Sequence, residues 1–332
     1  MKKVLFYLAL IQVVNPNVPL KNEYSSRSYI VLDGHSGEIL EGKDYHLKRS
    51  VASISKIMTA IIALESDKLF YVYTVKEDVI NVEGSSVYLK LNEQYRLIDL
   101  VYGLMLRSGN DAAYAISSFV YNDNDKFILK MNEKAKEIGM KNTFFNNPCG
   151  LDIDDEGNIS TSYDMALLMK YCLKNKLFNE VISTKEYHFN GHVYVNKNKL
   201  LKNYEYLLGG KTGFTHKARR TLVTAAEKDN QKLIVVTLDC GNDFAFHKEL
   251  YESYFSKYQY IVFLNEGLNY FDEYVFMTDR LIGMRIDKKV ALKGTKKYYI
   301  NIYTHKLKIS FVDKQNIEYF GGEFESVKFN IR

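Results

Sequence analysis

Apolar residues recur at helical spacing in three stretches of this chain. After Ser53 they occupy positions 54, 57, 58, 61, 62 and 64, and neither Gly nor Pro interrupts them before position 68. Further helices are predicted over 97–106 and 111–120, separated by a segment that contains Ser108-Gly109-Asn110. The pattern therefore places Ser53 at the N-terminus of a buried helix and 108–110 in a loop between two helices.

Alternating or short apolar runs predict strands elsewhere. Two short strands over 29–32 and 37–40 are joined by a glycine-containing turn, which predicts an opening hairpin. Segments 221–225 and 233–238 read as adjacent strands around a turn-prone stretch. Lys211-Thr212-Gly213 lies just upstream, so we expect it on a neighbouring strand.

The order of elements predicts an α/β chain with a β-rich end. Thr161-Ser162-Tyr163-Asp164 has the spacing of a capping box and predicts a helix start, and 243–258 reads as a helix. After about residue 263 the pattern changes to alternation. Because 332 residues exceed a usual single-core domain, we expect a leader over 1–22, a main domain over 23–262 and a small β-rich domain over 263–332.

The N-terminus has the layout of a secretory signal. Met1-Lys2-Lys3 is followed by an apolar run from Val4 to Val14 that only Gln12 interrupts, and Pro16 ends it. Such a run is too short to span a bilayer as a helix. We therefore expect export to an extracytoplasmic site, in the cell wall or at the outer face of the cytoplasmic membrane, although a buried first element is the alternative.

Charge and composition assign no cofactor. The formal charge of +5 is spread over the whole length, which is no nucleic-acid footprint, and it leaves cell-wall or peripheral membrane association open. The three cysteines are widely spaced, so they predict packing residues. His188 and His192 are four apart, but Gly191 argues against the helix that a metal site of this spacing needs. We expect chemistry without metal or cofactor.

Ser53-Ile54-Ser55-Lys56 supplies a nucleophile and a base. A serine hydroxyl needs a base within hydrogen-bond reach, and residues i and i+3 share a helix face. A lysine in the first turn of a buried helix has a lowered pKa, because burial and the helix dipole both disfavour its charge. Lys56 is therefore the expected base for Ser53.

The same helix start and the Lys211 strand provide anion-binding groups. The backbone N–H of Ser53 and that of Phe214 are the expected oxyanion donors. Lys211 and Thr212 would hold a substrate carboxylate, and Gly213 leaves room for substrate backbone. A peptide with a free carboxylate terminus is the implied ligand.

The joint occurrence of three motifs carries the functional assignment. A lone S-x-x-K arises by chance about once or twice in a chain this rich in Ser and Lys. Here S-x-x-K at Ser53, S-G-N at Ser108 and K-T-G at Lys211 each occur once and in that order. This set is typical of class A β-lactamases and penicillin-binding proteins.

At these residues the chain closely resembles the low-molecular-mass penicillin-binding proteins, the serine D-alanyl-D-alanine carboxypeptidases. The resemblance runs from about Ser28 to Tyr258 and includes the segments 50–60, 106–113, 147–151, 160–166 and 209–215. It implies the transpeptidase fold of penicillin-binding proteins and β-lactamases, an antiparallel sheet flanked by helices with a helical subdomain, so that 23–262 is the catalytic domain.

The resemblance also implies roles. Ser53 is acylated by the peptidoglycan stem peptide with release of terminal D-alanine, Lys56 is the base, Ser108 relays the proton and Asn110 holds the acyl-donor amide. Water then hydrolyses the acyl-enzyme. β-Lactams are the implied inhibitors.

Two departures from relatives leave alternatives open. Arg219 and Arg220 stand where many members have a small residue and Gly-Tyr, and they either strengthen carboxylate binding or face solvent. Many relatives end in an amphipathic anchor helix, which the tail to Arg332 does not show, so tethering to the membrane stays open.

Two other functions share the same residues. A class A β-lactamase would need a Glu-x-x-Leu-Asn segment between the second and third motifs, and none occurs. A wall-peptide sensor that binds without turnover would have no need of Ser53 and Lys56. The carboxypeptidase is therefore favoured over both.

Overall fold

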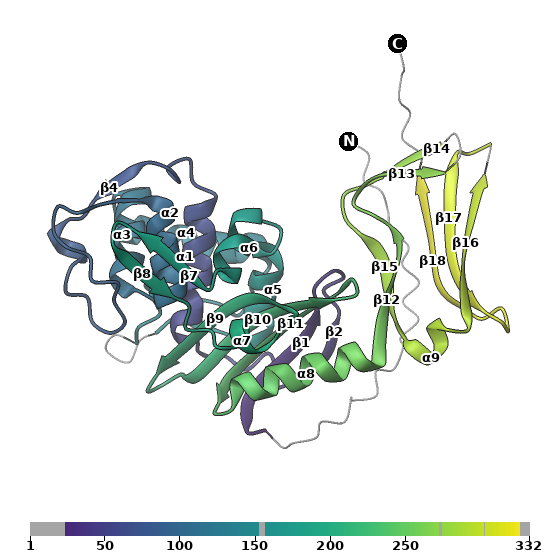
Figure 1. Cartoon of the computed structure of the whole chain (residues 1–332), viewed down its shortest axis with the longest axis horizontal. Coiled ribbons are helices and arrows are strands. Elements are labelled where there is room, and N and C mark those ends of the chain that lie inside the picture. The colour runs from purple at the N-terminus through teal and green to yellow at the C-terminus, as the bar shows by residue number, and fades with distance from the viewer. Residues whose placement is uncertain (1–23, 153–156, 272–273, 302, 326–332) are drawn as a thin grey trace, which may run out of the picture. The chain divides into compact units, whose positions relative to one another are not determined.

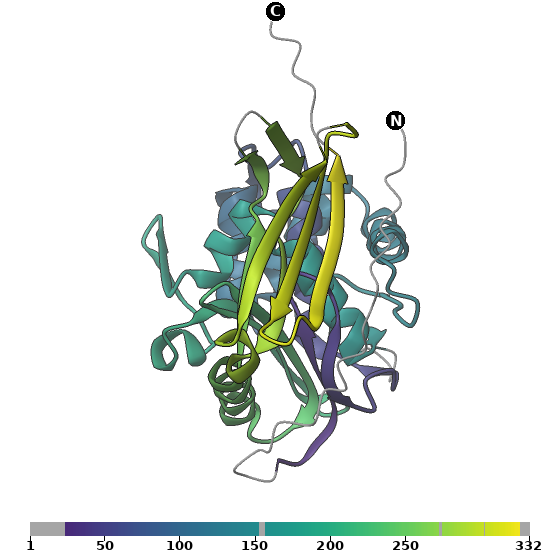
Figure 2. The same cartoon turned by 90° about the vertical axis from the view of Figure 1, so that its right-hand side faces the viewer.

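The computed structural model describes residues 24–152, 157–271, 274–301 and 303–325. These residues form two compact units (Figures 1 and 2). The first unit holds the described residues up to Glu227 together with Lys232–Glu252, and the second holds Lys228–Gln231 and the described residues from Ser253 onward. The domain limits expected at residues 22 and 262 stay predictions, and the leader lies outside the described residues.

A five-stranded sheet of order β2-β1-β11-β10-β9 organises the first unit. β1 pairs antiparallel with both β2 and β11, and β10 pairs antiparallel with β9. Its strands are β1 (Ser26–Asp33), β2 (Ile39–Lys43), β9 (Leu207–Thr215), β10 (Arg219–Lys228) and β11 (Gln231–Cys240). The expected opening hairpin, adjacent strands and neighbouring Lys211 strand are thus confirmed.

The two faces of this sheet contact different helices because successive side chains alternate. Val223 and Ala225 point into the main hydrophobic core, which they share with apolar residues of the helices between β2 and β9. Thr224 lies between them and bonds to His247 and Tyr251 of α8 (Asp243–Lys257) instead. Figure 1 shows α8 running along the sheet, apart from the helices of the core.

The helical part of the first unit is built around a fully buried helix. All nine residues of α1 (Lys56–Leu64) are buried, which is typical of a helix surrounded by other elements. The surrounding elements are α2 (Leu97–Tyr102), η3 (Gly103–Arg107), α3 (Asn110–Tyr121), α4 (Asn124–Ile138), α5 (Ser162–Cys172) and α6 (Lys176–Ser183). The short helix α7 (Leu200–Asn203) packs instead against β9. The Thr161 side chain caps α5 by accepting a 3.0 Å bond from the Asp164 N–H, as the capping box predicts.

Two predicted helices differ locally from expectation. Residues Ala52–Ser55 form a 3₁₀ turn, η1, and the α-helix begins only at Lys56. The helix expected over 97–106 ends as a π-helix, η3, that leads into a left-handed residue, Ser108. Both departures occur next to a motif residue, where irregular helical turns often serve function.

Short strand pairs border the helical part. β3 (Arg49–Ser50) pairs with β6 (Ile159–Ser160), β4 (Val72–Thr74) with β5 (Gln94–Arg96), and β7 (Glu186–Phe189) with β8 (His192–Val195). A 3₁₀ turn, η2, covers Glu77–Val79. His188 and His192 therefore lie on a hairpin and not on a helix.

The second unit is β-rich, as the alternation after residue 263 predicts. β12 (Tyr258–Leu264) pairs with β15 (Ile282–Asp287), and β13 (Gly267–Phe271) pairs with β14 (Tyr274–Thr278). A three-stranded sheet consists of β16 (Gly294–Asn301), β17 (Lys306–Asp313) and β18 (Glu318–Glu325). The short helix α9 (Lys288–Ala291) precedes β16 in the chain. Alternate residues of β17, Leu307, Ile309 and Phe311, fill its core. In the described part of the chain, no helix combines the length and apolarity needed to cross a membrane.

Candidate active site

The nucleophile candidate Ser53 sits in a turn that its surroundings force. Ala52 has a φ of +51°, which a residue with a Cβ adopts only when neighbours impose it. Gly150 packs against this turn with a φ of +82°, and a Cβ there would come within 2.1 Å of the Ala52 carbonyl oxygen. The Thr221 hydroxyl of β10 donates a 3.0 Å bond to the Val51 carbonyl. Sheet and loop together fix the position of Ser53.

Lys56 contacts Ser53 and is held by two further acceptors. Its Nζ lies 2.9 Å from Ser53 Oγ, 2.7 Å from Asn110 Oδ1 and 2.5 Å from the Cys149 carbonyl oxygen. The side chain is fully buried, and this burial lowers its pKa to about 8, opposed by Cys149. With this pKa an appreciable fraction of Lys56 is the neutral amine near neutral pH, which is the form that a general base needs.

The second motif joins the end of one helix to the start of the next. Ser108 has a φ of +65° and ends η3, and Asn110 is the first residue of α3. The Asn110 N–H donates to the Ser85 carbonyl at 2.6 Å, and its Nδ2 donates to the Glu83 carbonyl at 2.6 Å. Asn110 is therefore oriented with its Oδ1 toward Lys56.

Lys211 connects the sheet to the second motif. Its Nζ donates 2.9 Å to Ser108 Oγ and 2.7 Å to the Thr212 carbonyl. The side chain is buried, and burial, followed by the charges of Lys56 and Lys197, lowers its pKa well below the usual range. A bound carboxylate would counter this effect, because an opposite charge stabilises the ammonium form.

The rest of the third motif lies against the nucleophile turn. A Cβ on Gly213 would come within 3.0 Å of the Ser53 backbone nitrogen and 3.1 Å of that of Ile54. Glycine is required for this close approach of strand to turn. Thr212 is half-buried, and the Phe214 side chain is 58% exposed. The structure thus gathers Ser53, Lys56, Ser108, Asn110, Lys211 and Gly213 in one place.

Sequence reasoning missed Asp152, which ties the nucleophile turn to the Lys211 strand. Its Oδ1 accepts a 2.6 Å bond from Ser50 Oγ, and its Oδ2 accepts a short bond from Thr215 Oγ1. Ser50 is three residues before Ser53, and Thr215 is the last residue of β9. The signal was available in Asn147-Pro148-Cys149-Gly150-Leu151, because an acid directly follows this turn segment.

Two further contributors also escaped the sequence reasoning. Asp111, next to Asn110, accepts bonds from the backbone N–H groups of Val87 and Leu89 and so anchors the loop that holds Asn110. Lys197 brings a third ammonium near Lys56 and Lys211, whose pKa values it lowers. No sequence pattern identifies Lys197 as a site residue. It comes close to Lys56 and Lys211 only because the β7–β8 hairpin, which it follows in the chain, folds against the site.

The two arginines after the third motif differ from each other. Arg219 is exposed, with a φ of +59°. The Arg220 guanidinium donates a 2.6 Å bond to Asp243 Oδ1 at the start of α8, and Asp243 is 2% exposed. Arg220 therefore neutralises a buried carboxylate, a role that the sequence analysis did not consider.

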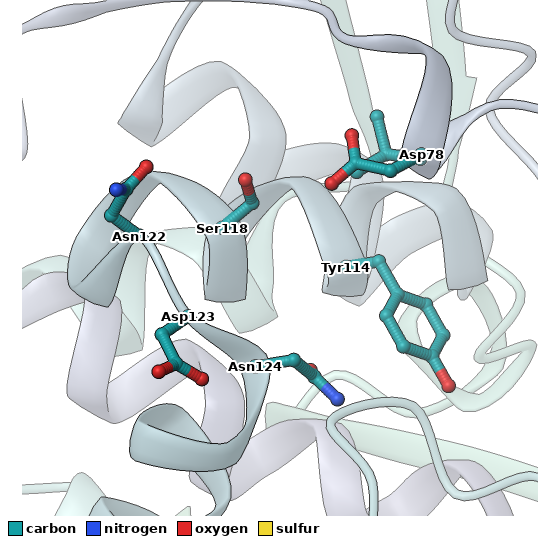
Figure 3. Close-up of a pocket in the computed structure, with 7 residues that line it drawn as sticks. Asp78, Tyr114, Ser118, Asn122, Asp123 and Asn124 are labelled. Carbon is teal, nitrogen blue, oxygen red and sulfur yellow. The ribbon is translucent and has the colours of Figure 1, made fainter.

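A separate polar pocket is lined by none of the motif residues. Figure 3 shows its lining, which comes from the end of α3, the start of α4 and η2: Asp78, Val79, Tyr114, Ser118, Asn122, Asp123 and Asn124. Burial and the neighbouring Cys149 raise the pKa of Tyr114, so this residue is a neutral phenol. In the described ranges, no three His, Cys, Asp or Glu side chains gather as metal ligands would, and the three cysteines are free and buried.

Comparison with known proteins now identifies the family. The family model described as D-alanyl-D-alanine carboxypeptidase matches residues 13–242, which contain all three motifs. The chain belongs to the D-alanyl-D-alanine carboxypeptidase family.

Relatives and solved structures agree with this membership. A D-alanyl-D-alanine carboxypeptidase of Bacillus subtilis strain 168 is 33% identical over 227 residues, 64% of this chain but only 57% of the relative, so the match spans little more than half of that protein. One from Mycobacterium tuberculosis is 32% identical over 64% of this chain and 74% of the relative.

Two solved structures show the fold. A D-alanyl-D-alanine carboxypeptidase from Mycobacterium tuberculosis H37Rv has a TM-score of 0.68 at 28% identity, over 72% of this chain and 93% of the other. Penicillin binding protein 6B from Escherichia coli has a TM-score of 0.76 at 24% identity, over 93% of this chain and 97% of the other. This chain therefore has the α/β fold of the penicillin-binding proteins together with a β-rich C-terminal region.

Proposed function

We propose that this protein is a serine D-alanyl-D-alanine carboxypeptidase of peptidoglycan stem peptides that β-lactams also acylate. The observation that carries the proposal is the 2.9 Å contact between Lys56 Nζ and Ser53 Oγ, made by a lysine whose pKa burial lowers to about 8. In its neutral form Lys56 takes the Ser53 proton while Oγ attacks the carbonyl carbon between the two D-alanines. An acyl-enzyme forms and the terminal D-alanine leaves as its amine.

The remaining residues of the site serve the steps around this attack. The Ser53 backbone N–H faces Gly213 across the cleft, and with the Phe214 N–H it would stabilise the developing oxyanion. Ser108 Oγ accepts a bond from Lys211, so its own proton is free to pass to the leaving amine, and Ser108 would regain a proton from the Lys56 ammonium that has taken the one from Ser53. Lys211 and Thr212 would bind the terminal carboxylate, and Asn110 the acyl-donor amide. Water then hydrolyses the ester.

D-Alanine release from a stem pentapeptide tests this function. We expect release by the wild type and none by Ser53→Ala, with an unchanged unfolding midpoint that shows the variant is folded. Mass spectrometry after penicillin treatment should place a single adduct on Ser53. A folded wild type that forms the adduct but releases no D-alanine would instead support the wall-peptide sensor, and rapid loss of the adduct with hydrolysed penicillin would support a β-lactamase.

We also propose export and action at the cell wall. The charged head and the apolar run from Val4 to Val14 support this proposal, because they have the composition of a secretory signal. Expression of the full chain in a bacterial host, followed by fractionation and N-terminal sequencing, tests it. A protein that stays in the cytoplasm with Met1 intact would contradict it.

A further inference from the structure

Lys197 lies at the edge of the candidate active site. Its backbone N–H donates a 3.1 Å bond to the Leu106 carbonyl in η3, two residues before Ser108. Its Nζ donates a 3.0 Å bond to Ser85 Oγ, and the Ser85 carbonyl accepts from the Asn110 N–H at 2.6 Å. Ser85 therefore bridges the Lys197 ammonium and the backbone of Asn110.

Arg107 brings a second cation to the same edge. Arg107 directly precedes Ser108 in the sequence. It directly follows Leu106, whose carbonyl accepts the bond from the Lys197 backbone N–H. Its side chain is half-buried, and its charge helps burial to lower the pKa of Lys197. The two cations thus lie close enough to repel each other.

Neither cation has an acidic partner within the described ranges. None of the ion pairs identified there includes Lys197 or Arg107. Lys197 is exposed and Arg107 is half-buried, so solvent screens part of their repulsion and an anion from solution can reach both and relieve the rest. A pair of this kind beside a substrate cleft is suited to a charged group of the substrate.

We infer that Lys197 and Arg107 form a second anion subsite, which binds a side-chain carboxylate on the stem-peptide residue that precedes the two D-alanines. The inference rests on the proposed function. The terminal carboxylate goes to Lys211, so the second carboxylate must come from elsewhere in the peptide. Ser85 links Lys197 to Asn110, the proposed ligand of the acyl-donor amide, and this link places the subsite on the acyl-donor side of the scissile bond. The preferred substrates are therefore stem peptides with an acidic third residue.

A matched pair of peptides tests this subsite. Acetyl-2-aminopimelyl-D-alanyl-D-alanine carries the side-chain carboxylate, and its ω-amide has the same length without the charge. We expect the wild type to prefer the acid by about tenfold in kcat/KM, mostly through KM, because the two cations bind the side-chain carboxylate alike in the ground state and in the transition state. In the double variant Arg107→Gln, Lys197→Gln the acid-to-amide ratio should fall to near one. Lys197→Arg should keep it.

The exposed neighbour Lys199 provides the matched control, since Lys199→Gln removes the same charge two residues away. We expect this variant to keep the wild-type ratio. Equal turnover of both peptides by the wild type, or an equal loss on both peptides in the double variant, would overturn the subsite.

Binding separates this inference from the proposed function. Calorimetric titration of both peptides into Ser53→Ala should show tighter binding of the acid, and the triple variant with Arg107→Gln and Lys197→Gln should lose that difference. Such a result supports the subsite even if no D-alanine is released. Equal affinities in Ser53→Ala would contradict it, whatever the activity.

Discussion

Lys211 donates a hydrogen bond to Ser108, with 2.9 Å between Nζ and Oγ, although 103 positions separate the two residues in the chain. One belongs to the edge strand β9 and the other to the left-handed turn between η3 and α3. This bond links the sheet to the helical part at the point where substrate must enter. The geometry of the site therefore depends on how the two parts of the first unit are held together.

The pH dependence of acylation should report Lys56. With a pKa of about 8, only about a tenth of Lys56 is neutral at pH 7, so the maximal acylation rate at saturating penicillin should rise with pH and level off above 8. Stopped-flow measurements between pH 6 and 9 test this. In Lys197→Gln the profile should move to higher pH, because Lys197 lowers the Lys56 pKa. A flat profile would exclude Lys56 as the base.

Asp152 should act as a positioning residue. In Asp152→Ala the hydroxyls of Ser50 and Thr215 lose their shared acceptor, so we expect the free energy of unfolding to fall by about 2 kcal/mol. Acylation should slow as well, and Asp152→Asn, which keeps one acceptor oxygen, should recover part of the rate. Denaturant titration and penicillin labelling measure both effects. Asp67→Ala, at an exposed site, is the control, and equal behaviour of the two alanine variants would refute the role.

Two glycines with similar backbone angles should differ in their tolerance of alanine. Gly150 has a φ of +82° and its Cβ would meet the Ala52 carbonyl at 2.1 Å, whereas Gly139 has a φ of +90° and meets nothing within 4 Å. Gly139→Ala should therefore cost only the backbone strain of about 1 kcal/mol, with acylation intact. Gly150→Ala should destabilise more and displace Ser53. Similar acylation rates in the two variants would show that Gly150 does not set the nucleophile turn.

His247 should make the protein sensitive to mild acid. It is buried between the hydroxyls of Thr224 and Thr237, and burial lowers its pKa to about 3. The unfolded chain takes up this proton near pH 6.5, so the free energy of unfolding should fall by about 1.4 kcal/mol per pH unit below 6.5 on account of this residue. Urea titrations at several pH values should show a smaller slope for His247→Gln. Equal slopes for the wild type and His247→Gln would refute this role of His247.

Much of the local structure follows from the sequence. The helical spacing after Ser53, the capping box at Thr161 and the strands on both sides of the 228–230 turn all appear where predicted, because apolar periodicity and capping act over a few residues. The irregular turns were not predicted. Ala52 and Ser108 have positive φ values that no local preference favours, and only contacts such as that of Gly150 with Ala52 impose them.

The sequence by itself determined which chemical groups the protein carries and in which order, since three short motifs identify the nucleophile, the base and the anion clamp. The tertiary structure decided which groups surround them. Asp152 and Lys197 belong to no motif, and they reach the site because a loop and the end of a hairpin fold against it. The same folding brings Lys197 close to Arg107, the sequence neighbour of Ser108. The lowered pKa of Lys56 likewise arises from burial by the whole domain, because desolvation depends on the packed surroundings and not on neighbouring letters.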